Sequence, residues 1–208
     1  TGFVLCSPLS PTNVIGTHNV LLACAEAGVE RCITVSSDKA CLPVTLYGHT
    51  KAVAEALTIQ ANAYNPTGTR SCVVRWGNVA GSQGSVIPIW REALRRGEKL
   101  GITDATATRF WVDMQEAVRL VEYAAMAPTR GMMYVPHSPA FTVSDLAVAL
   151  IRKTFQLEAM PEQVALLHTV NIPRRPAEKL HELLMTEEEQ RRALWIDGMA
   201  QCYMIPSV

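Results

Sequence analysis

The spacing of apolar residues alternates between two periods in the first part of the chain. After a Ser-Pro-Thr sequence at 10–12, which favours a helix start, apolar residues recur at helical spacing up to Gly28. Three further segments follow: a β-branched, buried strand at 31–36, an alanine-rich helix at about 47–63 and a buried strand at 70–76. This alternation predicts an α/β fold with a parallel sheet.

The elements become shorter and the loops longer after about residue 80. The pattern there predicts helices at about 88–96, 115–127 and 144–155, strands at 132–135 and 167–172, and a charged helix at 178–192. A nucleotide-binding core followed by a lobe that caps it would give this change of character. We therefore expect a Rossmann-like parallel sheet with a smaller C-terminal α/β lobe.

Composition and charge narrow the functional classes. Hydrophobic residues make up 49% of the 208 residues, enough for a sizeable core, and the formal net charge is zero. No basic excess indicates a nucleic-acid partner. The longest apolar runs are far shorter than the ~20 residues that cross a bilayer. We expect a cytoplasmic protein with no membrane span and no nucleic-acid partner.

The cysteines do not form a metal-binding pattern. None belongs to a Cys-x-x-Cys pair, and no Cys/His cluster has zinc spacing. Most lie inside apolar runs, so we expect reduced, buried, small hydrophobic residues and no metal site. The six are Cys6, Cys24, Cys32, Cys41, Cys72 and Cys202.

The chemically suggestive residues gather around the first predicted strand and the helix after it. Tyr47 and Lys51 lie four positions apart, so they share one helix face, and a nearby ammonium favours the tyrosine phenolate. Such a phenolate can take a proton from a sugar hydroxyl, and the lysine can hold a ribose hydroxyl of a nicotinamide cofactor. Ser36 and Ser37 lie at the carboxyl end of the strand that precedes this helix. Open parallel sheets bind ligands at the carboxyl ends of their strands. A Tyr-x3-Lys sequence alone often occurs by chance, so the order of these elements carries the prediction.

Five sequence blocks stand in order along residues 12–182. The blocks are Thr12-Asn-Val-Ile-Gly16, Val35-Ser-Ser-Asp-Lys-Ala40 with Tyr47-Gly-His-Thr-Lys51, Val74-Arg-Trp-Gly-Asn-Val79 with 81–88, Ile102-Thr-Asp104 with Thr108-Arg-Phe110, and 175–182. Together they resemble the extended short-chain dehydrogenases that dehydrate UDP-N-acetylglucosamine. Chance matches do not keep such an order.

The resemblance implies a dehydratase mechanism. Tyr47 with Lys51 would deprotonate the sugar 4-hydroxyl while NAD or NADP takes the hydride from C4. Lys39 would remove the C5 proton, which the 4-keto group acidifies, and Asp38 would protonate the departing 6-hydroxyl. The hydride then returns to C6. Without the other blocks, Asp38 and Lys39 would be a surface ion pair on a loop.

The resemblance also implies which residues bind the cofactor and the substrate, and which part of the chain forms each domain. Residues 1–80 would be the C-terminal half of the NAD(P)-binding domain, and residues 81–208 mainly the lobe that binds a UDP-sugar, with segments that return to the core. A homo-oligomer is a further expectation. The implied cofactor-binding residues are Ser36, Ser37, Tyr47, Lys51 and Asn78. The implied substrate-binding residues are Asn78, Val79, Ser85, Val86, Arg109, Arg175 and Glu178.

The sequence departs from the family pattern in three places. Trp76 stands where the family usually has Tyr, and Ala177 where it usually has Gly, which would alter the turn after Arg175. No Gly-x-Gly-x-x-Gly phosphate-binding loop occurs, so we expect a chain that lacks the N-terminal strands of the fold.

Two alternatives stay open beside a UDP-N-acetylglucosamine 4,6-dehydratase. One is an epimerase or a dehydratase of another nucleotide sugar, although Asp38 and Lys39 argue against a plain 4-epimerase, which needs no elimination acid. The other is a fragment that binds nucleotide sugar without turnover.

Overall fold

The structure is a computed structural model that divides into two compact units, which are described separately. It describes residues 10–64, 68–82, 84–157, 159–198 and 200–207. The first unit takes Thr1–Gly77, Met114–His137 and Leu183–Val208, and the second takes Asn78–Asp113 and Ser138–Glu182.

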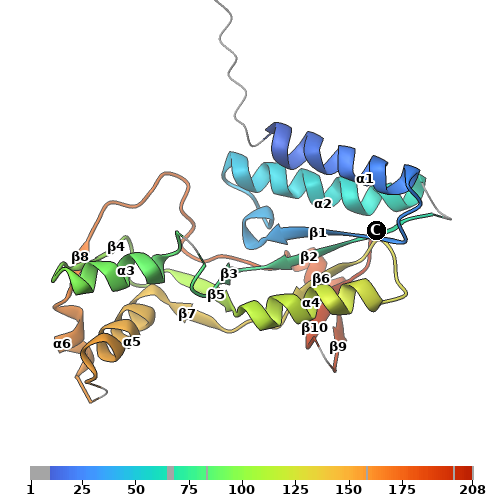
Figure 1. The fold of residues 1–208 in the computed structure, drawn as a ribbon. Coiled ribbons are helices and arrows are strands. Elements are labelled where there is room, and N and C mark those ends of the chain that lie inside the picture. The colour runs from blue at the N-terminus through green and yellow to red at the C-terminus, as the bar shows by residue number, and fades with distance from the viewer. Residues whose placement is uncertain (1–9, 65–67, 83, 158, 199, 208) are drawn as a thin grey trace, which may run out of the picture. The chain divides into compact units, whose positions relative to one another are not determined.

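A five-stranded sheet forms the centre of the first unit (Figure 1). Its strand order is β1-β2-β6-β10-β9: β1 (Arg31–Ser37), β2 (Arg70–Trp76), β6 (Met133–Pro136), β10 (Cys202–Ile205) and β9 (Leu194–Ile196). The pairs β1–β2 and β2–β6 are parallel, whereas β10 is antiparallel to both of its neighbours. Within the described residues β1 pairs only with β2, so β1 is an edge strand.

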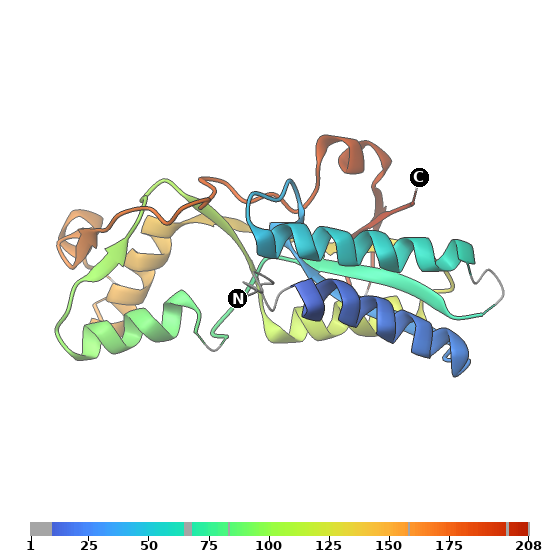
Figure 2. The ribbon, with the colours of Figure 1, turned by 90° about the horizontal axis from the view of Figure 1, so that it is seen from above.

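Helices cover both faces of this sheet. The π-helical turn η1 (Pro11–Ile15) leads into α1 (Gly16–Glu26), which lies beside α2 (Leu46–Tyr64) on one face (Figure 2). Helix α4 (Met114–Met126) packs on the other face, against β1, β2 and β6. Pro11 supplies the fixed φ that suits a first helical turn.

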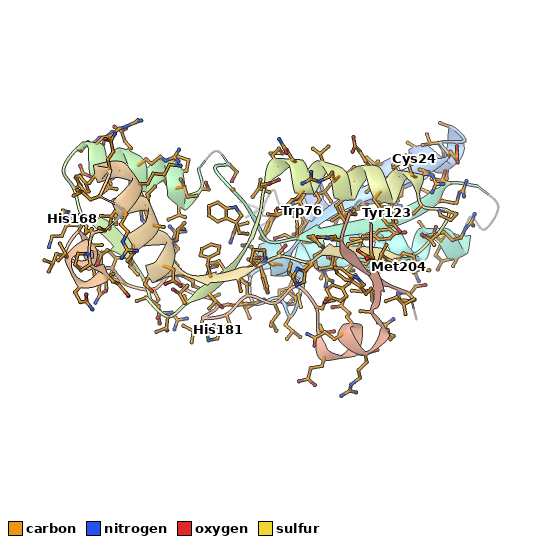
Figure 3. All side chains as sticks on the ribbon, turned by 90° about the horizontal axis from the view of Figure 1, so that it is seen from below. Cys24, Trp76, Tyr123, His168, His181 and Met204 are labelled. Carbon is orange, nitrogen blue, oxygen red and sulfur yellow. The ribbon has the colours of Figure 1, made fainter. Side chains whose placement is uncertain are left out.

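The core of the first unit lies between α4 and the sheet. Val74, Leu120, Tyr134 and Cys202 are almost inaccessible to solvent there, and Trp76, Tyr123 and Met204 pack against them (Figure 3). On the opposite face, the hydroxyls of Thr34 in β1 and Thr58 in α2 lie 2.7 Å apart and share a hydrogen bond. Burial of apolar surface on both faces explains why the strands are apolar runs and do not alternate.

The second unit combines small sheets with helices around a separate core. One sheet has the order β3-β5-β7: β3 (Asn78–Val79), β5 (Thr108–Val112) and β7 (Ala140–Thr142). A parallel pair joins β4 (Leu100–Ile102) to β8 (Thr169–Asn171). The helices are α3 (Val86–Arg95), α5 (Val143–Phe155) and α6 (Glu162–Leu166). Trp90, Leu100 and Ile151 lie in the core that these elements enclose.

The predicted fold class and most predicted elements are confirmed, with two corrections. The charged helix expected at 178–192 is wrong: only α7 (Glu187–Arg192) is helical, because the Thr186 side chain caps it with Glu189 in a capping box. The strand at 31–36 is only partly buried, since Val35 is 43% exposed at the free edge. The pattern did not predict the strands β3, β4, β5, β7, β9 and β10 or the short helix α6, which are all six residues or shorter.

Four of the described cysteines are buried: Cys32, Cys41, Cys72 and Cys202. Cys24 is half-buried, and Cys6 lies outside the described residues. Burial raises the pKa of Cys32 to about 12, which keeps that thiol protonated and unreactive. Among the described helices, none combines the length and the apolar character needed to cross a membrane.

A buried arginine joins three segments of the first unit. Arg75 in β2 is 3% exposed, and its guanidinium donates to both carboxylate oxygens of Glu55 in α2, at 2.9 and 2.6 Å. It also donates to both oxygens of Glu189 in α7, at 2.9 and 3.0 Å, and to the Leu184 carbonyl at 2.9 Å. Five charge-assisted bonds satisfy this fork, as a buried charge requires.

Replacement of Arg75 should strongly destabilise the chain. Arg75→Ala leaves the buried carboxylate of Glu55 and the partly buried carboxylate of Glu189 without their cation, so we expect the free energy of unfolding to fall by about 3–5 kcal/mol in urea titrations. Arg70→Ala is the matched control in the same strand, because Arg70 pairs with Glu30, whose side chain is 73% exposed, and should cost about 0–1 kcal/mol. Equal losses in the two variants would contradict a special role for the buried arginine.

The same network predicts loss of stability in acid. Burial alone would raise the pKa of Glu189, but the hydrogen bonds and charge of Arg75 outweigh it and hold this pKa below its ordinary value of 4.5. A lowered folded-state pKa gives stability that is present above 4.5 and is lost as the pH falls through the folded value. We expect Glu189→Gln to be less stable at neutral pH and to depend less on pH below 4.5. Glu187→Gln, at an exposed position of the same helix, should keep the wild-type slope.

Candidate active site

The end of β1 holds an aspartate in an unusual position. Ser37 caps the short 3-10 turn η2 (Asp38–Ala40): its hydroxyl accepts from the Lys39 backbone N–H at 3.3 Å and donates to Asp38 Oδ1 at 2.8 Å. Lys39 Nζ also donates to Asp38 Oδ1, at 2.9 Å. Asp38 is fully buried, while the Lys39 side chain is 40% exposed. The turn therefore presents a buried acid directly beside a base that solvent can reach.

Two buried oxygens at this strand end have no hydrogen-bond partner among the described atoms. They are Oδ2 of Asp38 and Oγ of Ser36. Buried polar atoms are nearly always paired, because an unpaired one costs about 1–3 kcal/mol. Both atoms thus mark positions that a ligand atom can complete. Asp38 Oδ1 accepts two hydrogen bonds, whereas Oδ2 accepts none among the described atoms, so Oδ2 is the oxygen that could exchange a proton.

Tyr47 and Lys51 lie on the first turns of α2, which packs directly on η2. Lys51 Nζ donates to the Val35 carbonyl of β1 at 3.0 Å, and burial lowers its pKa while Glu55 partly opposes this. The Tyr47 carbonyl accepts from Thr50 Oγ1 at 2.9 Å, and Thr50 in turn accepts from Asn13 Nδ2 at 3.0 Å. The structure therefore brings the two predicted residue pairs to one end of the first unit.

A hollow of about 410 Å³ runs along the free edge of β1. Residues of η1, α1 and β1 line it, and Lys51 borders it from α2. Ser36, whose buried hydroxyl has no partner among the described atoms, lies near the carboxyl end of the same strand, where open parallel sheets bind ligands. The Ser37 hydroxyl is engaged by the turn itself.

The second unit holds the other predicted residues around a carboxylate. Glu178 Oε1 accepts from Arg109 Nη2 and from Thr103 Oγ1, both at 3.0 Å, and Oε2 accepts from the Arg175 backbone N–H at 3.2 Å. Burial would raise the pKa of Glu178, but these hydrogen bonds and the charges of Arg109 and Arg175 hold it below the ordinary value. Arg109 also donates to the Leu180 carbonyl at 3.1 Å, so its guanidinium is fixed in place.

The remaining predicted substrate residues occupy β3 and the start of α3. Asn78 Nδ2 lies 3.5 Å from the Phe110 carbonyl, and Val79 pairs with Val112 of β5. Ser85 stands at the N-cap of α3, but its buried hydroxyl makes no cap bond and has no partner among the described atoms. Val86, the first residue of α3, is 40% exposed. Ser85 thus resembles Ser36, whose buried hydroxyl also has no partner among the described atoms.

The structure also shows contacts that the sequence alone did not reveal. Thr103 donates a hydrogen bond to Glu178, and Asn13 donates one to Thr50 of helix α2. Both Thr103 and Asn13 lie in sequence blocks that resemble the family, but neither was predicted as a site residue. The Thr108 hydroxyl and His181 Nδ1 lie 2.9 Å apart in the second unit, where Figure 3 labels the histidine. These partners are 37 to 75 positions apart in sequence, so no local pattern could reveal them.

Comparison with known proteins gives consistent matches. The family model described as a polysaccharide biosynthesis protein matches residues 7–203. The UDP-N-acetylglucosamine 4,6-dehydratase (inverting) of Campylobacter jejuni is 39% identical over 182 residues, which cover 86% of this chain and 50% of that protein. A protein of Rickettsia rickettsii named UDP-glucose 4-epimerase is 37% identical over 196 residues, 94% of this chain and 54% of its own. The chain thus spans about half the length of the curated relatives it matches.

A solved structure shows the same fold. DesIV, a dTDP-glucose 4,6-dehydratase from Streptomyces venezuelae crystallised with NAD and TYD bound, superposes with a TM-score of 0.72 at 19% identity. The match covers 96% of this chain and 62% of DesIV. It confirms the Rossmann-like α/β class that the sequence predicts.

The turn that carries Glu178 contains a strained residue. The Glu178 N–H donates to the Arg175 carbonyl at 3.1 Å, Pro176 follows Arg175, and Ala177 has a φ of 60°. This is the pattern of a type II turn, in which glycine is preferred at the third position. The left-handed backbone costs alanine about 1–2 kcal/mol, which the glycine of a typical family member would avoid.

Ala177→Gly should therefore stabilise the second unit. We expect a gain of about 0.5–1 kcal/mol in the free energy of unfolding, since the relief of strain exceeds the added entropy of glycine in the unfolded chain. Ala165→Gly is the control, because Ala165 lies inside helix α6 and is buried, and it should destabilise. Urea unfolding measures both, and a loss of stability in Ala177→Gly would contradict this account of the turn.

Proposed function

The chain belongs to the polysaccharide biosynthesis protein family, and on that basis we propose that it carries the catalytic and substrate-binding part of a nucleotide-sugar 4,6-dehydratase. The proposed substrate is UDP-N-acetylglucosamine and the product a 4-keto-6-deoxy sugar, with or without inversion at C5. The observation that carries the proposal is the buried Asp38 with one unpaired oxygen, adjacent to Lys39 and packed beside the Tyr47 helix. The elimination needs a base that removes the C5 proton and an acid that protonates the oxygen leaving C6. Lys39 and Asp38 in this turn would supply the two groups.

The first half of the reaction would use the α2 pair. Tyr47 would remove the proton of the 4-hydroxyl, and Lys51 lies one turn further along the same helix. A bound nicotinamide dinucleotide would supply the acceptor for the C4 hydride and its later donor to C6. Lys51 Nζ now donates to the Val35 carbonyl, so a ribose hydroxyl can compete for this donor without movement of the helix.

The second half would use the η2 pair. Lys39 would pass its proton to Asp38 along their hydrogen bond and would then take the C5 proton that the 4-keto group acidifies, while Asp38 gives its proton to the 6-hydroxyl, which leaves as water. The bond from Lys39 Nζ to Asp38 Oδ1 and the unpaired Oδ2 support this division of roles.

Each unit has its own proposed binding residues. We propose that the first unit holds the nicotinamide end of NAD or NADP through Ser36, Ser37, Tyr47 and Lys51, in line with the NAD in DesIV. Asn78, Val79, Ser85 and Val86 would contact the nucleotide sugar. Arg109 and Arg175 would face the diphosphate, and Glu178 a ribose hydroxyl of the uridine. Arg109 and Glu178 form an ion pair in the structure, so the two groups are already oriented.

Further expectations belong to the complete protein. The relatives' greater length leaves room for the strands that carry a phosphate-binding loop, and the free edge of β1 is where such strands would pair. A homo-oligomer in the cytoplasm that binds no nucleic acid remains part of the proposal. An epimerase is the second candidate, which the Rickettsia relative favours and the Asp38–Lys39 pair disfavours.

The decisive test is a product assay. The chain, and a version extended at its N-terminus to the relatives' length, are incubated with UDP-N-acetylglucosamine and NAD or NADP, and the 4-keto-6-deoxy product is followed by NMR. The extended protein should form product, and Asp38→Asn and Lys39→Ala should each lower kcat about 100-fold or more, the range of general acid–base catalysis. His49→Ala, an exposed neighbour on α2, is the control and should keep full activity.

The other outcomes distinguish the alternatives. A C4 epimer as product, unaffected by Asp38→Asn, would establish an epimerase. Tight binding of uridine diphosphate by both proteins without any product would establish a binding module. Product from the 208-residue chain alone would show that this part of the protein suffices for the reaction.

A further inference from the structure

Gly48 makes the tightest backbone contact of any described glycine in the chain. A Cβ atom added there would lie 2.2 Å from the Lys39 carbonyl oxygen and 3.0 Å from Cβ of Pro43. Carbon atoms in van der Waals contact are ~3.5–4 Å apart, so a methyl group cannot fit unless the backbone moves by ~1 Å. The obstacle is a backbone oxygen, which cannot rotate away as a flexible side chain could.

This contact lies between the two proposed catalytic pairs. Gly48 directly follows Tyr47 on α2, and the oxygen it meets belongs to Lys39 of η2. We infer that Gly48 is a positioning residue: its missing side chain sets the separation between the Tyr47–Lys51 pair and the Asp38–Lys39 pair. The inference rests on the proposed function for its catalytic meaning, but the steric contact itself does not depend on it.

Glycine is otherwise a poor choice at this position. Gly48 is buried inside the first turns of a 19-residue helix, where alanine favours the helix more than glycine does. On helix formation alone, Gly48→Ala should therefore be stabilising. The close approach of the Lys39 carbonyl explains why a residue without Cβ stands here.

The surroundings determine which side of the contact would move. The body of α2 is tied to the sheet through Glu55, which binds the buried Arg75, and through the hydroxyl pair of Thr58 and Thr34. By contrast, η2 is a three-residue turn held by the Ser37 cap and by the bond from the Cys41 N–H to the Asp38 carbonyl at 3.1 Å. A methyl at Gly48 would thus displace the turn as a whole, and Asp38 and Lys39 with it.

The displacement would slow the elimination without slowing the oxidation. Oxidation transfers the C4 hydride to the nicotinamide and the O4 proton to Tyr47, and it needs only the α2 pair. Elimination transfers the C5 proton to Lys39 and breaks the C6–O bond as Asp38 protonates the leaving oxygen, and it needs η2 in place. A shift of ~1 Å is enough to slow a positioned step by about 100-fold.

The test compares Gly48→Ala with the wild type in the extended protein and in this chain. In the extended protein we expect dehydration to slow about 100-fold, while reduced nicotinamide builds up after addition of the sugar nucleotide and persists. In the chain itself, amide NMR shifts of residues 38–41 should change, whereas those of residues 58–62, farther along α2, should not. His49→Ala should leave dehydration and both sets of shifts as in the wild type.

Two results would overturn the inference. One is dehydration by Gly48→Ala at the wild-type rate, and the other is unchanged shifts at residues 38–41. Gly16→Ala controls for an added methyl on a helix, because the new Cβ would meet only the Pro11 carbonyl at 3.5 Å; a melting temperature of Gly48→Ala close to that of Gly16→Ala excludes unfolding as the cause. If the extended wild type forms no dehydrated product, the proposed function fails, and the NMR shifts decide the steric inference alone.

Discussion

The buried guanidinium of Arg75 joins parts of the first unit that are far apart in sequence. Its five bonds reach Glu55 on α2, Glu189 on α7 and the carbonyl of Leu184, so a central strand, the helix with Tyr47 and Lys51, and the C-terminal segment are fixed together. A buried guanidinium without its carboxylate partners would be strongly destabilising, so these segments are held in one specific arrangement. The geometry of the proposed site depends on this bond network because it fixes the helix against the sheet.

The site itself follows from where strands end. Parallel strands bring their carboxyl ends to one edge, and β1 ends in a turn whose cap leaves Asp38 buried with one oxygen free. The buried oxygens Ser36 Oγ and Asp38 Oδ2 in the first unit, and Ser85 Oγ in the second, have no hydrogen-bond partner among the described atoms. The protein thus carries unsatisfied polar atoms at the residues that the family resemblance singled out, although nothing in that resemblance requires them to be unpaired.

In the second unit, the charged side chains of Glu178 and Arg109 are held in fixed positions. Glu178 is held by a hydroxyl, a guanidinium and a backbone N–H, and this fixed carboxylate in turn orients Arg109. If the proposed nucleotide sugar binds here, such an arrangement would reduce the entropy lost on binding, because these side chains are already fixed. The strained φ of Ala177 shows that the turn keeps its form even without the glycine that would suit it best.

The sequence by itself determined the α/β class, the long helices and the parallel strands of the first unit, because these depend on local periodicity and on runs of apolar residues. It also singled out Asp38, Lys39, Tyr47 and Lys51, because these residues stand in ordered motifs. It failed at 178–186, where a charged pattern typical of a helix is outweighed by the bonds of Glu178 and by the Thr186 cap. Only the tertiary structure decided which oxygens lack partners, which carboxylates hold Arg75, and that Gly48 meets a backbone oxygen, because each of these depends on atoms that the fold brings together from separate segments.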